Sequence, residues 1–519
     1  MKKIVAMGAA VALAASMFAA EPAANPQVLD FNGNASVEWG VDLDAGKTGF
    51  KNAQEASIKA KLFDGGDKAT SGDGVWAELK IVADTKDNEY KNEADGSVNI
   101  KAPKVDTAKI HIYNFYVGIQ KGDTVTGEFK PTAAIVSDKA WLGNVGPAGF
   151  TQGLVFGYDD SNIAAAVDFR SFEDTSKDTP TQYTNAYAIA AEATMKDANE
   201  WVEGLEVKGG VSYNFSKNYY VNSNNLAVKK FVLGIDINDD DIVDLGADSI
   251  LGYSGSVAYK VALDDKYYIK PMAGIAGEVV SGELNTFDYS ASANEFVASV
   301  LFGWGAQADA NAGVPFLDGD DAKKVTPGVS VVFTMPLPTK LTMGSNDTSE
   351  YDRDIAKIVP SIYSGDIFDG LKFGAYSEII LMRDEAEVGS DYEKKACKNK
   401  DRATAIAIAA GASYDVKAGD VTITTKAGAR YANKAYVENE FIGKDKDGKE
   451  VGLFKDLGYA KDDEGYLNLK IGADINGLLD NTTFFVNYTS ANLLNEIDYK
   501  DDMYAVKAGT LNVGAKIHF

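Results

Sequence analysis

The chain has 519 residues and a formal net charge of −25, with 51 Lys and Arg against 76 Asp and Glu. This excess of acid argues against a nucleic-acid partner, because phosphate backbones are bound through clustered cations. One cysteine and two histidines exclude an internal disulfide framework and a cysteine-based zinc site, and they argue against histidine-dependent catalysis. The 50 glycines, 12 prolines and 26 tyrosines are typical of a chain built mainly of strands.

Residues 1–20 are predicted to form a secretory signal peptide with cleavage near Ala20. Two lysines precede an apolar run from Ile4 to Ala15, and small residues come before Glu21. No later stretch reaches about 18 consecutive apolar residues, so a helical inner-membrane protein is excluded. The exported chain is therefore either soluble or a barrel in an outer membrane.

Apolar and polar residues alternate along much of the remaining chain. In residues 205–215, Leu205, Val207, Val211, Tyr213 and Phe215 share one parity, and the other parity is polar or glycine. Successive side chains of a β-strand point to opposite faces, so this pattern predicts strands between an apolar and a wet environment. The same pattern occurs at 31–44, 163–170, 296–304 (where Leu301 interrupts the polar row), 421–431 and 467–475.

The length of these runs favours a membrane barrel over a soluble all-β protein, which remains the alternative. Many runs are about nine to eleven residues long, the length that crosses a bilayer when a strand is tilted near 45°. The predicted fold is all-β, a large antiparallel transmembrane β-barrel of roughly 16–20 strands with long acidic loops. The candidates for lining its lumen are Glu38, Glu206, Lys208, Lys426, Arg430, Lys470 and Asp474.

The last nine residues are typical of the C-terminal strand of bacterial outer-membrane proteins, which the outer-membrane insertion machinery reads. Such a strand presents an apolar outer face and must close the barrel edge. We expect the insertion machinery to act on this strand as an assembly signal. Its in-phase positions are Leu511, Val513, Ala515, Ile517 and Phe519.

Two segments carry a resemblance to a known family. Residues 35–52 contain a strand with a Trp39-Gly-Val-Asp-Leu43 core followed by a Gly-Phe-Lys-Asn turn, and residues 108–119 form a second matching strand. This pattern resembles the treponemal major outer sheath protein family. The resemblance implies an abundant trimeric outer-membrane porin that is also a surface antigen and binds host extracellular-matrix proteins. It brings no catalytic motif.

The interpretation is an outer-membrane porin that allows passive diffusion of small hydrophilic solutes. The alternative is an adhesin that binds a host matrix protein without open-pore transport. We expect residues 21–519 to form one barrel within outer-membrane lipid, with a periplasmic domain over 21–230 and a barrel over 231–519 as the alternative.

Other motifs carry weaker signals. The acidic stretch Asp236–Asp244 lacks the glycine and the bidentate glutamate of a calcium-binding EF-hand. His111 and His518 are isolated, and Cys397 lies among lysines in a loop segment. We expect no enzyme activity, no cofactor and no metal site.

Overall fold

The computed structural model describes the strands and many of their connections. The described residues are 28–43, 46–63, 74–84, 104–121, 132–136, 152–171, 187–214, 219–220, 246–284, 287–304, 313–317, 325–337, 339–343, 347–351, 356–365, 367–381, 404–436, 465–494 and 509–518. No helix within these ranges is long and apolar enough to cross a membrane.

The described chain is almost entirely strand. In chain order the strands are β1 (Val28–Asp42), β2 (Lys47–Phe63), β3 (Val75–Asp84), β4 (Lys104–Ile112), β5 (Phe115–Lys121), β6 (Gln152–Asp159), β7 (Ile163–Ser171), β8 (Tyr187–Met195), β9 (Leu205–Asn214), β10 (Tyr219–Tyr220), β11 (Gly246–Tyr259), β12 (Val261–Ala262), β13 (Tyr267–Leu284), β14 (Phe287–Trp304), β15 (Gly328–Pro336), β16 (Thr339–Met343), β17 (Asp347–Tyr351), β18 (Ala356–Tyr363), β19 (Leu371–Leu381), β20 (Ala405–Ala418), β21 (Val421–Asn433), β22 (Gly465–Asn476), β23 (Thr482–Thr489) and β24 (Thr510–His518).

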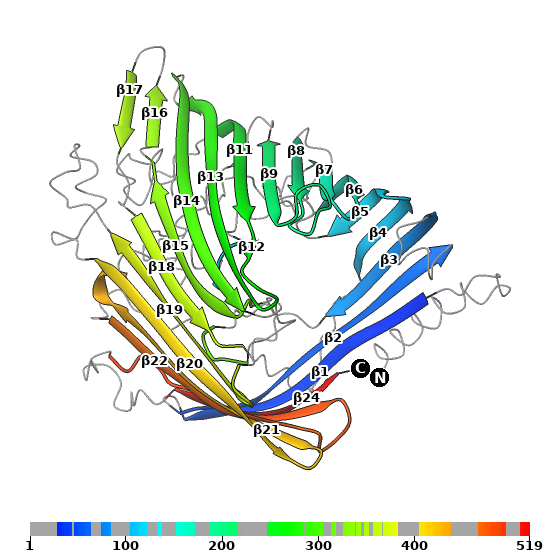
Figure 1. Cartoon of the computed structure of the whole chain (residues 1–519), viewed down its shortest axis with the longest axis vertical. Helices are drawn as coiled ribbons and strands as arrows, with labels where there is room; N and C mark the ends of the chain where they lie inside the picture. Colours follow the sequence, from blue (N-terminus) through cyan, green and yellow to red (C-terminus); the bar gives the residue numbers. More distant parts are fainter. Residues whose placement is uncertain are drawn as a thin grey trace.

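These strands form one antiparallel sheet that closes on itself (Figure 1). Each main strand pairs with the next along the chain, and β24 returns to pair with β1 from Asn34↔His518 to Asp42↔Thr510. The short strands β10, β12, β16 and β17 extend their neighbours, which leaves 20 strands around the barrel. The predicted fold class is confirmed, at the upper end of the expected strand number. Closure satisfies the backbone hydrogen bonds that an open sheet edge would leave unpaired.

The barrel has two different ends. We call the end where β1 begins and β24 finishes the terminal end; its connections include the short turns 113–114, 160–162, 196–204, 263–266, 364–370, 419–420 and 477–481. The opposite end, the loop end, carries the connections 85–103, 122–151, 382–404 and 434–464 among others. Most connections at the terminal end are tight turns, with 305–327 as a long exception. Long connections at one end and tight turns at the other are typical of outer-membrane barrels.

Candidate functional site: the barrel lumen

The two faces of the barrel wall differ in exposure and chemistry. β15 shows this most clearly, because buried and exposed residues alternate along its full length. Val329, Val331 and Phe333 are exposed on the outside, whereas Ser330 and Thr334 are buried on the inside. The outer face of the barrel is therefore an apolar surface suited to lipid, and the polar side chains of this strand face inward.

The seven predicted lumen residues lie on the inner face. Arg430 is buried opposite Ala409 of β20 and Asn468 of β22, and Lys470 pairs in register with Gly428. Lys426 forms an ion pair with Asp474 on the neighbouring strand. Glu206 and Lys208 lie together on β9 and form an ion pair at 3.0 Å. On β1, Glu38 lies between the exposed Val37 and Trp39, so it points to the opposite face.

An ion-pair network surrounds Glu206 near the terminal end. The buried Lys270 of β13 contacts Glu206 at 2.5 Å and Asp197 of the turn 196–204 at 3.7 Å. Sequence reasoning missed Lys270 because it follows a run of apolar and aromatic residues in Tyr267–Lys270. Its register against Leu301 of β14 places it on the inner face.

A second buried network has Glu378 of β19 at its centre. The Glu378 carboxylate lies 2.9 Å from the Lys357 ammonium of β18 and 3.7 Å from the Arg430 guanidinium of β21. It also accepts a 2.9 Å hydrogen bond from the Tyr436 hydroxyl. A buried carboxylate requires partners of this kind, because an isolated buried charge is costly. The network ties three strands to residues 434–436 at the loop end.

The inner face of β3, β4 and β5 carries a row of aromatic and charged side chains. The rings of Trp76 and His111 stack with centroids 3.8 Å apart and an interplanar angle of 5°. Glu78 lies 3.7 Å from the His111 Nε2 and 3.0 Å from the ammonium of Lys59. His111 is thus held by ring stacking and by a carboxylate. Within the described ranges, no group of three or more His, Cys, Asp or Glu residues is arranged to hold a metal ion.

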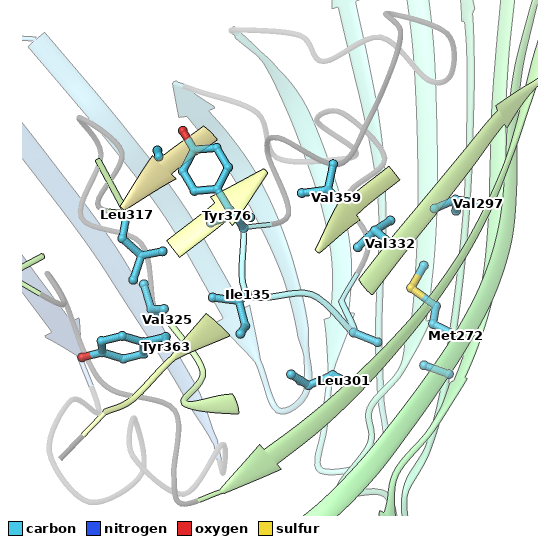
Figure 2. Close-up of a cluster of buried hydrophobic side chains, with 14 of the residues drawn as sticks. Ile135, Met272, Val297, Leu301, Leu317, Val325, Val332, Val359, Tyr363 and Tyr376 are labelled. Atoms are coloured by element: carbon cyan, nitrogen blue, oxygen red, sulfur yellow. The ribbon is translucent and has the colours of Figure 1, made fainter. Parts of the chain in front are cut away.

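Two segments that are not strands lie inside the barrel. They are Thr132–Val136, which comes from the loop end, and Gly313–Leu317, which comes from the terminal end. Both belong to one cluster of buried apolar residues with inward side chains of the wall. Figure 2 shows Ile135 on a segment crossing the interior, with Met272, Leu301 and Val332 on the surrounding strands. This part of the inner wall is therefore apolar and is covered by the two segments.

The first inward segment is fixed by hydrogen bonds to the wall. The Ile135 N–H donates to the Ser330 hydroxyl at 3.0 Å, and the Ser330 and Ser361 hydroxyls are 2.7 Å apart. The Thr132 N–H lies 3.3 Å from the sulfur of Met272. These side chains supply polar partners where the backbone of the segment is buried.

The second inward segment lies in a groove made by three glycines. Gly374, Gly411 and Gly428 are in register on β19, β20 and β21. A Cβ atom would lie 2.5 Å from the Leu317 side chain at Gly374, 2.4 Å from the Pro315 carbonyl at Gly411, and 2.8 Å from the Pro315 Cβ at Gly428. The glycines therefore allow the segment to approach the wall, and any larger residue would exclude it.

The edge of this groove carries a charged side chain. The ammonium of Lys470, in register with Gly428, lies 4.9 Å from the centroid of the Phe316 ring. Val314 is fully buried and Leu317 nearly so. The segment Gly313–Leu317 and Lys470 together form the boundary between the covered wall and the lumen. We call this arrangement the lumen constriction.

The C-terminal strand closes the barrel. Val513 pairs with Trp39 of β1 and Val486 of β23, and Val513 and Ile517 are exposed on the outer face. Leu511 and Ala515 have the same parity, while Phe519 lies outside the described residues. Residues 1–20, Asp236–Asp244 and Cys397 also lie outside them.

Comparison with known proteins supports the sequence interpretation. No family model matches the chain. The chain is 28% identical over its full length to the major outer membrane protein MspA of Treponema maltophilum, which is also covered in full. It is 28% identical to the major surface protein MspTL of Treponema lecithinolyticum, with 95% of this chain and 94% of that protein covered. These full-length similarities confirm the resemblance to the treponemal outer sheath proteins and the predicted outer-membrane location.

Solved structures of outer-membrane proteins also align with the chain. The in-vitro folded, trimeric OmpT of Vibrio cholerae is 10% identical with a TM-score of 0.35, covering 95% of this chain and 100% of that one. OmpF of Salmonella typhi in complex with daunomycin is 13% identical with a TM-score of 0.32, covering 95% and 97%. The barrel fold itself is established by the strand pairing of this chain.

Proposed function

We propose that the protein is an outer-membrane porin through which small hydrophilic solutes diffuse passively along the uncovered part of the lumen. The observation that carries this proposal is the polarity of the closed wall, with exposed apolar side chains outside and ion pairs inside. A closed barrel of this strand number encloses more space than its wall side chains fill. Diffusion needs no reaction chemistry, so we propose no enzyme activity. The names of the full-length relatives, a major outer membrane protein and a major surface protein, support the same assignment.

Single-channel recording tests this function. The mature chain, refolded and inserted in a planar lipid bilayer, is expected to give discrete and persistent conductance steps, and a salt gradient reports ion preference through the reversal potential. Folding is checked independently by the heat-modifiable electrophoretic mobility of the barrel. A folded, inserted protein without conductance would contradict the porin assignment and leave the adhesin alternative, in which the inward segments and loops close the lumen.

We propose that residues 21–519 form a single barrel unit after removal of residues 1–20. The support is the sheet itself, in which β1 to β9 pair in sequence with β11 onward and β1 pairs with β24. A chain reduced to 231–519 would leave β24 without β1 and β11 without β9. It is expected not to give a heat-modifiable barrel, whereas a folded barrel from that fragment would favour the periplasmic alternative for 21–230.

We also propose a homotrimer, assembled after insertion of the β24 strand by the outer-membrane machinery, with loop-end segments available to host matrix proteins. Chemical crosslinking in outer membranes distinguishes a trimer from a monomer. Deletion of residues 511–519 is expected to abolish membrane insertion, because β1 and β23 would lose their shared partner.

A further inference from the structure

The turns at the terminal end present apolar residues to the outside. In soluble turns and periplasmic turns the usual residues are Gly, Asn, Asp and Ser. Here three turns carry an apolar pair followed by an acid and a glycine or asparagine. The pairs, each 46–60% exposed, are Trp201 and Val202, Ile367 and Phe368, and Leu478 and Leu479; a fourth turn carries the exposed Leu263 before Asp264.

Hydrogen bonds order the backbone of the turns that carry these pairs. The buried Asn199 amide donates to the carbonyls of Val202 at 3.1 Å and Leu205 at 2.8 Å. Its oxygen accepts hydrogen bonds from the N–H groups of Trp201 at 3.0 Å and Val202 at 2.7 Å. A polar side chain that is almost fully buried thus fixes the backbone at Trp201, whose side chain is exposed.

The other turns are held in comparable ways. The Asp264 carboxylate accepts hydrogen bonds from the N–H groups of Lys266 and Tyr267, both at 2.7 Å. In the turn 364–370, the Ser364 carbonyl accepts a 2.9 Å hydrogen bond from the Trp304 indole. In the turn 477–481, Asn481 has a positive φ of 54°, and its carbonyl accepts a hydrogen bond from the His518 N–H at 2.8 Å.

The apolar pairs are continuous with the lipid-facing wall. The Phe368 ring lies 6.0 Å from the ring of Phe373, and Phe373 has the outward parity of the exposed Leu371. Leu263 follows the exposed Tyr259 and Val261, and Leu478 follows β22, whose outer face includes the exposed Ile471. The same surface that contacts acyl chains therefore continues around the rim of the terminal end.

We propose that these apolar pairs form a lipid-anchored collar that inserts the turns of the terminal end into the glycerol and acyl boundary of the phospholipid leaflet. Trp, Phe and Leu are the residues that partition into this region, and the following acids face water. The collar fixes the depth of the barrel in the membrane. It does not depend on conduction, so failure of the porin assignment would leave it unaffected.

Trp201 is a natural reporter of this insertion. The chain has five tryptophans, and replacement of Trp39, Trp76, Trp141 and Trp304 by Phe leaves Trp201 alone. The variant is refolded into phosphatidylcholine vesicles, with or without brominated phosphatidylcholine whose bromines lie close to the glycerol backbone. Heat-modifiable mobility verifies the fold. We expect loss of Trp201 emission in the brominated vesicles and protection from aqueous iodide.

Two calibration variants make the result decisive. A reporter that keeps only Trp39 gives the quenching of an exposed side chain on the lipid-facing wall of β1. An Asp420→Trp reporter, with the five native tryptophans replaced by Phe, samples the polar turn 419–420 at the same end. Bromolipid quenching of Trp201 that approaches the Trp39 reporter supports the collar. Quenching no greater than that of the Asp420→Trp reporter overturns it.

A second probe covers loss of folding in the single-tryptophan variants, since Trp76 is stacked on His111. A Trp201→Cys, Cys397→Ser protein retains the other tryptophans and has one thiol. Labelled there with nitrobenzoxadiazole, it is expected to shift its emission to shorter wavelength when the folded protein passes from detergent with a polar head to phosphatidylcholine vesicles. Emission identical to that of the same label at an Asp420→Cys, Cys397→Ser site would overturn the proposal.

Discussion

Valine at Gly428 tests whether the inward segment Gly313–Leu317 limits passage through the lumen. A Cβ at this position would lie 2.8 Å from the Pro315 Cβ, 3.0 Å from the Ala410 carbonyl and 3.1 Å from the Phe316 ring. The β-branched side chain adds two further methyl groups in the same place. Overpacking of this kind costs about 1–3 kcal/mol, and the flexible partner is the segment, because the wall is held by strand hydrogen bonds.

The expected change in conductance depends on how this cost compares with the energy that holds the segment in place. We call the segment Gly313–Leu317 seated when it lies against the glycine groove. Burial of Val314 and Leu317 stabilises the seated segment by about 1.5–3 kcal/mol for each side chain, and the sum of the two is the seating energy. The single Gly428→Val change is therefore smaller than the seating energy, and it should raise the unseated population roughly 5–150-fold without making it dominant. A Gly411→Val, Gly428→Val protein overpacks the same segment at two positions, so the total cost becomes about equal to the seating energy.

Single-channel recording of folded, inserted protein provides the assay. We expect Gly428→Val to show more frequent visits to a conductance level above that of the wild type, and the double variant to occupy the higher level for much of the time. Gly472→Ala is the matched control. It is also on the inner face, but the atoms nearest to its Cβ belong to β23 and not to the inward segment: the terminal amide of Asn487, which can rotate away, and the Val486 carbonyl at 3.0 Å. Its conductance should therefore match the wild type. A folded double variant with the wild-type distribution of conductance would refute the reasoning.

Three further predictions concern the wall and its turns. Glu378→Gln leaves the buried Lys357 and Arg430 without their carboxylate and should cost about 3–5 kcal/mol of stability. The loss is measured as a lower urea midpoint of the heat-modifiable band, and Glu38→Gln on β1 is the less buried control. An equal midpoint for the two variants would contradict this role. Ser330→Ala removes the hydroxyl that accepts from Ile135 and should cost about 1–3 kcal/mol locally, seen as faster proteolysis at residues 132–136; unchanged cleavage would show that the segment is held by apolar contacts alone. The N–H of Ile163 and then the Tyr158 hydroxyl hold the pKa of Asp160 below its ordinary value of 3.8, so its stabilisation of the turn 160–162 is complete above that pH and is lost as the pH falls below it. Asp160→Ala should therefore lower the unfolding midpoint at neutral pH and converge with the wild type in acid, and a constant difference across pH would contradict this.

The strands were predictable because each faces lipid on one side. The alternation at 421–431 and 467–475 falls within β21 and β22, and the C-terminal pattern from Leu511 to Ile517 falls within β24. Lipid tolerates few exceptions on its side, so the outer parity is regular in sequence. The inner parity is less regular, and this is where the sequence interpretation is incomplete.

Leu301 illustrates the limit. It interrupts the polar row of 296–304 and has no explanation in a wall that faces water. In the structure it is buried against the inward segments, together with Val297 of the same strand. The signal that could have revealed the covered wall was thus present as a break in alternation. Its partner could not be identified, because Ile135 and Leu317 lie in connections without periodicity.

Glu378 and Lys357 were missed for a related reason, although Arg430 was among the predicted lumen residues. Glu378 lies in a strand with Ile379, Ile380 and Leu381, where the apolar run hides the inner parity. Its partners, Lys357 and Arg430, come from strands that only the register brings together. Sequence periodicity assigns a face to each residue, whereas an ion pair across neighbouring strands requires the stagger of the barrel.

The lumen constriction and the terminal turns share one sequence pattern. Phe316 and Leu317 precede Asp318 and Gly319, as the exposed pairs at 201–202, 367–368 and 478–479 precede an acid and a glycine or asparagine. Like those turns, this segment leaves the terminal end of the barrel. An apolar pair at the terminal end is stable only in contact with an apolar environment, and outside the barrel that environment is lipid. Inside the barrel the apolar environment is the glycine groove of β19, β20 and β21, because the missing side chains leave strand backbone and apolar neighbours accessible to the segment. The direction in which a turn folds is therefore decided by the wall it meets, and filling the groove should convert the lumen constriction into one more outward turn.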